Sequence, residues 1–283
     1  MMQPSVFLDR LERSATPLRV RTPLGAMMWR RWGTGAPLVL LHGGSGSWRH
    51  WARNIEALAA VRTVWVPDLL GMGDSDAPAH PPNRPEAARA VLAALDELLA
   101  TQPFDLVGFS YGGSIAAIAT ELAPARVRSL TLVGTAGFGG SRDPQTVRVN
   151  GLAGAERAAA HRANLESLMI AAPARVDALA IEIQEQNTSR RRVKFGRDRG
   201  TPYLPRALQH YRGPLRVVWG AHDQFSRGHI DDYAARLRAV RPDIEVKVFA
   251  DAGHWVPYED ADGFNDFLLA RLEDQVGCRL EER

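Results

Sequence analysis

Short apolar runs alternate with helical patterns along much of the chain. An apolar run that ends at glycine, proline or aspartate indicates a buried strand. We predict strands of this kind at 38–41, 63–66, 104–109, 129–134, 215–219 and 244–249. Apolar residues at helical spacing predict intervening helices at 50–60, around 91–99, at 112–122 and at 262–272. Continuous apolar strands separated by helices are typical of a parallel sheet covered on both faces.

Two segments depart from this alternation. Residues 18–32 predict an antiparallel hairpin at the edge of the sheet. From about Gly140 to Tyr211 the chain has no strand-like run, and its Ala- and Arg-rich pattern predicts amphipathic helices. A helical stretch inserted between two sheet strands indicates a cap over one end of the sheet. We therefore predict an α/β core in 1–139 and 212–283, with a helical cap in 140–211.

Composition is that of an ordinary globular protein, with 45% hydrophobic and 24% charged residues in 283. The net charge is +3, and arginines are spread along the chain, which favours a solvated surface over nucleic-acid binding. The glycines of 43–46 are not followed by the lysine of a phosphate-binding loop. With no metal-ligand cluster or dinucleotide fingerprint in the sequence, we expect neither a cofactor nor a metal.

The sequence also indicates the cellular compartment of the protein. Cys278 is the single cysteine, so no internal disulfide forms, and we interpret it as a bystander near the C-terminus. Residues 1–21 do not read as a secretory signal, and no apolar run approaches the roughly 20 residues that span a bilayer. We expect a cytoplasmic protein without a membrane partner. The oligomeric state stays open, although a homodimer is the commonest assembly.

The sharpest local motif is Gly108-Phe109-Ser110-Tyr111-Gly112-Gly113, between an apolar strand and a small-residue helix. Gly-x-Ser-x-Gly in this context is typical of a nucleophile elbow, where the serine occupies a strained strand-to-helix turn. The flanking glycines remove collisions that side chains would cause. The helix N-terminus directs its N–H groups toward the same spot. The alternative is an ordinary glycine-rich turn with a helix-capping serine.

A serine nucleophile needs a base, and the base needs an orienting acid. Asp223 and His254 lie in the loops that leave two successive predicted strands. The carboxyl ends of parallel strands share one edge of a sheet, so both side chains can converge on Ser110. Asp251 is an alternative acid and His222 an alternative base, although direct sequence neighbours do not easily orient one another. We predict the triad Ser110, Asp223 and His254.

The segment His42-Gly43-Gly44-Ser45-Gly46 follows the first buried strand. Acyl transfer develops negative charge on an oxygen, which fixed N–H donors stabilise. We predict that the N–H groups of Gly44 and Tyr111 form this oxyanion hole, and that Gly43 and Ser45 border the substrate pocket. A plain glycine-rich turn anchored by His42 is the alternative, and both interpretations can hold together.

Together these motifs resemble the α/β-hydrolase fold superfamily, from about Leu18 to Leu272. The resemblance rests on His42-Gly43-Gly44, Gly108 to Gly113, the aspartate after Trp219-Gly220, and Gly253-His254. It implies a mostly parallel eight-stranded sheet with helices on both faces and a helical cap inserted before the last two strands. Residues 68–75 are similar to the superfamily's loop after the second parallel strand, which we interpret as a structural turn.

Within the superfamily, Gly253-His254-Trp255, the glycines after Ser110 and the cap look most like the meta-cleavage-product hydrolases. Those enzymes cleave carbon–carbon bonds in vinylogous 1,5-diketones from aromatic degradation. By this resemblance Trp255 lines the pocket, and a packed core aromatic is the alternative. We expect a cofactor-free hydrolase whose partner is a small acyl or diketone substrate.

Some features depart from that subfamily. Its oxyanion loop usually continues Gly-Pro-Gly, where this chain has Ser45 after Gly44, and its elbow commonly has Asn and Met in place of Phe109 and Tyr111. Its cap carries an arginine for the substrate carboxylate. The basic cluster Arg190, Arg191, Arg192 and Lys194 suits an acidic substrate, but a solvated helix face is the commoner interpretation of such a run.

Other functions of the same fold are alternatives, because fold does not fix the reaction. A carboxylesterase or lactonase would use the same triad on small esters, and haloperoxidases and lyases also occur on this fold. Epoxide and haloalkane hydrolases of this type use aspartate at the elbow, so Ser110 argues against them. A non-catalytic ligand-binding homologue is the alternative from a different class, because such receptors can retain all three triad residues.

Overall fold

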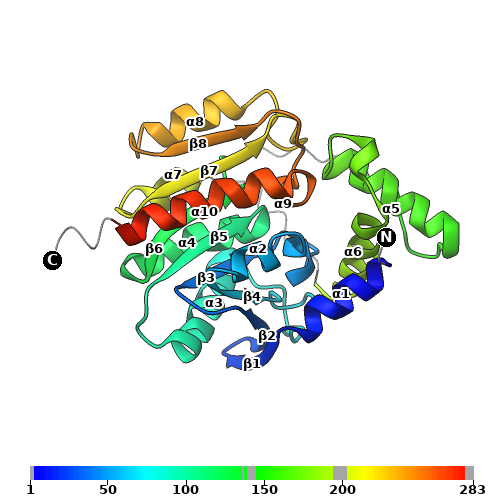
Figure 1. The fold of residues 1–283 in the computed structure, drawn as a ribbon, viewed down its shortest axis with the longest axis horizontal. Coiled ribbons are helices and arrows are strands. Elements are labelled where there is room, and N and C mark those ends of the chain that lie inside the picture. Colours follow the sequence, from blue (N-terminus) through cyan, green and yellow to red (C-terminus); the bar gives the residue numbers. More distant parts are fainter. Residues whose placement is uncertain (1–2, 136, 139–144, 194–202, 278–283) are drawn as a thin grey trace.

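The computed structural model describes residues 3–135, 137–138, 145–193 and 203–277. Its centre is an eight-stranded sheet in the order β1-β2-β4-β3-β5-β6-β7-β8 (Figure 1). The strands are β1 Thr16–Thr22, β2 Gly25–Trp32, β3 Pro37–Leu41, β4 Thr63–Pro67, β5 Phe104–Phe109, β6 Val127–Val133, β7 Leu215–Gly220 and β8 Glu245–Phe249. Pairing is antiparallel from β1 to β2 and from β2 to β4, and parallel elsewhere. The predicted sheet and its edge hairpin are confirmed.

Helices cover both faces of this sheet. Side chains alternate along each strand, so Leu38 and Leu40 of β3 enter one core cluster while Val39 and Leu41 enter the other. One cluster includes residues of α3 (Arg84–Leu99), α4 (Tyr111–Leu122), α7 (Leu204–Leu208) and α8 (Ile230–Arg238). The other includes residues of η1 (Trp48–Trp51), α2 (Ile55–Ala59), α9 (Val256–Glu259) and α10 (Ala261–Gly277). Short 3-10 turns complete the connections at η2 (Pro124–Arg126) and η3 (Pro173–Arg175).

The helix expected at 50–60 is divided in two. Ser47 accepts a hydrogen bond from the Arg49 N–H and so begins the 3-10 turn η1, and the regular helix α2 starts only at Ile55. Between them, the side chain of Asn54 donates to the backbone oxygen of Pro257 and to the side chain of Asn265. These contacts with the C-terminal helices are tertiary, which is why the helical spacing of the sequence did not predict the break.

An N-terminal helix that the sequence pattern did not reveal, α1 (Pro4–Arg13), packs on the same side of the molecule as α6 (Ala178–Ser189) (Figure 1). It buries Leu8 and Leu11, and its Arg10 forms two hydrogen bonds to Glu56 of α2. The helix therefore joins the α2 surface to the segment inserted between β6 and β7.

The inserted segment itself divides into two parts. Figure 1 shows α5 (Gly154–Leu168) and α6 beyond one end of the sheet. In contrast, Leu204 and Leu208 of α7 are buried in the cluster that includes α4, so α7 covers the sheet rather than its end. Residues 140–144 and 194–202 of the predicted cap, including Lys194, lie outside the described residues, as does Cys278.

Across the described ranges, no helix combines the length and the apolar character needed to cross a membrane.

Candidate active site

Ser110 lies at the turn between β5 and α4. Its backbone has φ 52° and ψ −114°, a left-handed conformation that non-glycine residues rarely adopt and that costs about 1–3 kcal/mol. A Cβ on Gly108 would lie 2.5 Å from the backbone oxygen of Gly112, and one on Gly112 would lie 2.4 Å from the backbone oxygen of Leu41. The expected need for glycine on both sides of the serine is confirmed.

His254 and Asp223 are in direct contact. His254 Nδ1 lies 2.9 Å from Asp223 Oδ2, and the two residues are only 3% and 1% exposed. Asp223 follows β7 and His254 follows β8, as the sequence order predicted. His222 and Asp251, the alternatives, are both exposed, so the structure brings together Asp223 and His254 instead.

Asp223 is ionised in this environment. Burial alone raises the pKa of Asp223, but the attraction of His254 and hydrogen bonds from His254 and the Phe225 N–H outweigh it, so this pKa lies below its usual value. The His254 ring contacts the rings of Phe109 and Phe225, with centroids at 5.0 and 4.6 Å. These contacts leave the imidazole one orientation beside a charged carboxylate.

Two histidines hold the loop after β3. His42 Nε2 accepts the Leu69 N–H at 2.9 Å, so its other nitrogen, Nδ1, donates to Gly43 O at 2.8 Å. His50 Nδ1 accepts the Gly43 N–H at 3.2 Å. Both backbone groups of Gly43 are thereby engaged within the loop. The Gly43–Gly44 peptide plane is fixed through the Gly43 oxygen, and the N–H of Gly44 is fixed with it.

Ser110, His254 and Gly44 line one cavity with a volume of about 470 Å³. Its other walls include Ser45, His50, Tyr111, Arg148, Asn164, Met169, Gln184, Thr188, Arg191 and Phe225. Gly43 and Trp255, both expected in the pocket, are not among the residues that line this cavity. Gly43 faces His50, and Trp255 is fully buried, stacks on Tyr258 at 4.2 Å and donates to His50 O at 3.0 Å.

In the described part of the chain, no hydrogen bond joins Ser110 Oγ to His254. Such bonds often tighten only when substrate is bound, so the shared cavity is the more informative observation. No group of three or more His, Cys, Asp or Glu side chains among the described residues is arranged to hold a metal ion.

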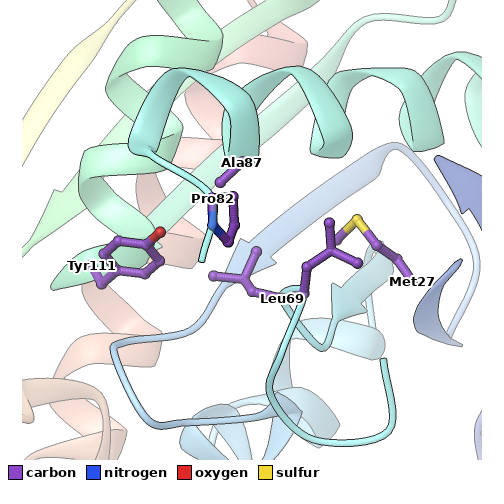
Figure 2. A pocket seen from close by; sticks show the side chains of 6 residues that line it. Met27, Leu69, Pro82, Ala87 and Tyr111 are labelled. Carbon is purple, nitrogen blue, oxygen red and sulfur yellow. The ribbon is translucent and has the colours of Figure 1, made fainter. Parts of the chain in front are cut away.

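Tyr111, the first residue of α4, separates this cavity from a much smaller one. Figure 2 shows its side chain at one side of this small cavity, with Leu69, Pro82 and Ala87 between it and Met27. The small cavity measures about 10 Å³, enough for about one water molecule. Burial raises the pKa of Tyr111 to about 12, against a weaker opposing effect of Arg84, so the phenol stays neutral. The Tyr111 ring therefore packs into an apolar wall and is not an acid–base group near neutral pH.

Arg190, Arg191 and Arg192 follow the end of α6 and so do not lie on a helix face, but Arg191 and Arg192 are exposed, as the solvated interpretation expects. Arg190 pairs with Asp74 at 2.8 Å, and the Arg192 N–H donates to Gly71 O at 2.8 Å. Arg191 Nη1 donates to Ser45 Oγ at 3.0 Å. The run therefore contacts the loops after β3 and β4, and Arg191 enters the cavity wall.

The loop at 68–75 has the structural role expected of it. Asp68 is completely buried and accepts the N–H groups of Trp48 and Asp74, both at 2.9 Å. Arg30 adds an ion pair with Asp68 at 3.0 Å. Gly73 has φ +52°, and a Cβ there would lie 2.3 Å from the Asp68 carboxyl group. Asp68 thus joins the η1 turn to the loop that Arg190 contacts.

Glu259 is a site residue that the sequence analysis missed. Its carboxylate is only 6% exposed and accepts three backbone N–H groups: Gly253 at 2.7 Å and Ala171 and Ala172 at 2.9 Å. Gly253 immediately precedes His254, and Ala171 and Ala172 follow α5. The one signal in the sequence is a carboxylate that follows an apolar run five residues after the histidine.

The fold and this arrangement define a class: a parallel sheet with a strained serine turn after one strand and a buried Asp–His pair after two others. Residues 36–261 match the alpha/beta hydrolase fold family. The chain belongs to that family.

Individual relatives agree with this assignment. The acetyltransferase component of an acetoin cleaving system from Pseudomonas putida is 34% identical over 250 residues, covering 84% of this chain and 64% of that relative. A 2-hydroxy-6-oxononadienedioate/2-hydroxy-6-oxononatrienedioate hydrolase from Paraburkholderia phymatum is 30% identical over 250 residues, covering 82% and 85%. The chain thus spans just under two thirds of the first relative and most of the second.

A solved structure shows the same fold. The meta-cleavage product hydrolase CumD from Pseudomonas fluorescens IP01 superposes with a TM-score of 0.71 at 21% identity, covering 91% of this chain and 98% of that one. At this identity the similarity concerns the fold alone. The subfamily that the motifs resemble is therefore present among the structural neighbours.

Proposed function

We propose that this protein is a serine hydrolase in which Ser110 is the nucleophile, His254 the general base and Asp223 the orienting acid. The observation that carries the proposal is the buried His254–Asp223 contact of 2.9 Å at the wall of the cavity that Ser110 also lines. A histidine held by an ionised carboxylate has one fixed orientation, and the carboxylate stabilises the imidazolium that forms when the serine proton is taken.

The proposed reaction proceeds through an acyl-enzyme. Ser110 Oγ attacks the acyl carbon while His254 takes its proton, and the N–H groups of Gly44 and Tyr111 stabilise the oxyanion. His254 then returns the proton to the leaving group, which is an oxygen in an ester or a carbon in a diketone. Water hydrolyses the acyl-enzyme by the same steps. Engagement of the Gly43 N–H with His50 favours Gly44 as the loop donor.

The positive charge of the cavity wall favours an acidic substrate. Arg191 and Arg148 line it, and no carboxylate side chain is among its described lining residues. A pocket lined by one sign of charge concentrates ligands of the opposite sign. The relative from Paraburkholderia phymatum is named for two dicarboxylates, a nonadienedioate and a nonatrienedioate, which fits this charge. We therefore favour an acyl substrate bearing a carboxylate, cleaved at a carbon–carbon bond, beneath a cap made of the described segment 145–193.

Labelling with a fluorophosphonate tests the nucleophile. We expect covalent modification at Ser110, loss of labelling in Ser110→Ala, and a fall in turnover of at least 10³-fold in that variant. Ser189→Ala is the matched control, because Ser189 is exposed and its hydroxyl donates to Gln186 O within α6. An unlabelled wild-type protein that still binds ligands would favour the non-catalytic homologue.

Paired esters test the charge of the substrate. We expect Arg191→Gln to raise KM for p-nitrophenyl hydrogen succinate about tenfold, a loss of about 1.4 kcal/mol, and to leave p-nitrophenyl butyrate nearly unchanged. Arg192→Gln removes the same charge one residue away, outside the cavity wall. Equal effects of both variants on both esters would contradict a carboxylate contact at Arg191. A ring-fission dienone and a neutral ester, compared in the wild type, separate carbon–carbon from ester hydrolysis.

The acyl-enzyme supports a second candidate reaction, transfer of the acyl group to a thiol instead of water. The 34% identity to an acetyltransferase component favours testing it. If the protein is a transferase, dihydrolipoamide will accelerate p-nitrophenol release from p-nitrophenyl acetate and yield the S-acetyl product. A hydrolase yields acetate at a rate that the thiol does not change.

A further inference from the structure

His50 is buried with one ring nitrogen engaged and the other at the cavity. The residue lies in η1 and is only 3% exposed. Its Nδ1 accepts the Gly43 N–H at 3.2 Å. A neutral imidazole carries its proton on one nitrogen, so with Nδ1 accepting, Nε2 carries the hydrogen and is a donor.

Packing prevents the ring from turning to another position. The Phe109 and Trp255 rings meet it edge-on, with centroids at 5.5 and 5.0 Å. A Cβ on Gly46 would lie 2.4 Å from His50 Nδ1 and Cε1, so the His50 ring packs directly against the backbone of this glycine. The backbone is held as well, because His50 N donates to Ser47 O and His50 O accepts from Trp255 Nε1, both at 3.0 Å.

The hydrogen-bonding capacity of Nε2 is directed to the cavity. His50 lines the cavity together with Gly44, Ser110 and His254. Within the part of the chain that the structure describes, no protein group accepts a hydrogen bond from Nε2. Nε2 is not a fully buried atom, so solvent in the cavity satisfies it in the free protein. A ligand that displaces this solvent must supply an acceptor, because a buried donor left unpaired is costly.

The ring stays neutral, which excludes a role as an acid. Burial, together with the nearby His42 and His254, holds the pKa of His50 well below its usual value. His50 and Ser110 line the same cavity, and the residue hydrogen-bonded to His50, Gly43, lies close to the serine: a Cβ on Gly43 would lie 3.3 Å from Ser110 Cβ. The donor is thus neutral, fixed and in the cavity of the serine.

We propose that His50 is a specificity-determining residue whose Nε2–H donates a hydrogen bond to a substrate oxygen. This oxygen is bonded to the carbon adjacent to the acyl carbon that Ser110 attacks. The proposal rests on the serine hydrolase function proposed above. It assigns to this pocket a preference for acyl groups with a keto, hydroxyl or ether oxygen beside the scissile carbonyl. A fixed donor left without an acceptor disfavours the hydrocarbon isostere, because a site built for a hydrogen bond rejects an analogue that lacks it.

Two esters that differ at one atom test this preference. p-Nitrophenyl methoxyacetate has an ether oxygen where p-nitrophenyl butyrate has a methylene group. Each kcat/KM is divided by the rate of uncatalysed hydrolysis, which removes the intrinsic reactivity of the methoxy ester. We expect the wild type to prefer the methoxyacetate at least tenfold after this correction.

Two variants separate the nitrogens of His50. The amide of His50→Asn can occupy the Nδ1 position and accept the Gly43 N–H, but it does not reach the Nε2 position. The longer amide of His50→Gln reaches the Nε2 position. We expect His50→Asn to reduce the preference to within about twofold and His50→Gln to retain part of the preference.

Several results would overturn the proposal: no preference in the wild type, an unchanged preference in His50→Asn, or an equal loss on both esters. An equal loss would mean that His50 acts only by holding Gly43. If neither variant folds, the imidazole ¹⁵N spectrum of the wild type decides, because a protonated Nδ1 refutes the assignment and a protonated Nε2 supports it. A wild type that fluorophosphonate does not label shows instead that the serine hydrolase function itself has failed.

Discussion

Replacing Glu259 with glutamine removes one carboxylate oxygen from a buried site with three backbone donors. In the protein, Oε2 accepts the N–H groups of Gly253 and Ala171, and Oε1 accepts that of Ala172. A glutamine can keep one oxygen, and it keeps most hydrogen bonds when that oxygen takes the Oε2 position. Its amide NH₂ then faces the Ala172 N–H, donor against donor.

The magnitude follows from these contacts. A hydrogen bond to a charged group contributes about 1.5–3 kcal/mol, and a buried donor left unpaired costs about 1–3 kcal/mol. The two bonds that remain also weaken, because the acceptor is no longer charged. We expect the free energy of unfolding to fall by about 3 kcal/mol, which for a chain of this size lowers Tm by roughly 5 °C.

The activity should change in a way that a purely structural role would not produce. Gly253 precedes His254, so a weaker hold on its N–H displaces the base from Ser110. We expect kcat to fall about tenfold and KM for the same ester to change less than twofold, because Glu259 lines no part of the cavity.

Urea unfolding, thermal unfolding and steady-state kinetics measure these effects. Glu86→Gln is the matched control, because half-buried Glu86 accepts one backbone N–H, that of Asn83 at the start of α3, and otherwise lies 3.8 Å from the exposed His80 ring, so its loss should cost less than about 1 kcal/mol. Unfolding of Glu259→Gln within 1 kcal/mol of wild type would refute the energetic reasoning. A large loss of stability with unchanged kcat would refute the positioning role.

Three further predictions concern the same site. Asp223→Asn should lower kcat/KM about 10³- to 10⁴-fold, because the imidazolium loses its charged partner; a loss below tenfold contradicts the proposed acid. Gly108→Ala should destabilise the fold by about 3 kcal/mol in urea, since the new methyl group meets backbone atoms at 2.5 Å, and unchanged stability would mean that the turn relaxes freely. His42 and His50 are buried with lowered pKa values, so the unfolded chain binds more protons below about pH 6.5 and stability falls as pH decreases, by up to about 1.4 kcal/mol per pH unit for each histidine. His50→Phe should flatten this dependence between pH 7 and 5, and an unchanged slope would contradict it.

The elements of the core were predictable because their signals are local. A buried parallel strand is a continuous apolar run, and the turn around Ser110 needs glycines within two residues of the serine. The order of strands also placed Asp223 and His254 at one edge of the sheet, because parallel strands share their carboxyl edge. These features depend on residues near each other in the chain or on a general rule of topology.

The contacts that complete the site depend on residues far apart in the chain. Packing against the Trp255 and Phe109 rings holds His50, and Ser45 becomes a partner of Arg191 only because the segment after α6 folds back on the loop after β3. The spacing of residues along the sequence does not predict such contacts.

The sequence by itself therefore determined the sheet, the serine turn and a short choice of acids and bases. Tertiary structure alone decided that Asp223, and not Asp251, lies against His254. It also decided that Glu259 holds the loop of His254 and that Arg191 enters the cavity wall. The physical reason is that burial and hydrogen-bond geometry are set by how separate elements pack, whereas turns and strands are set by the residues within them.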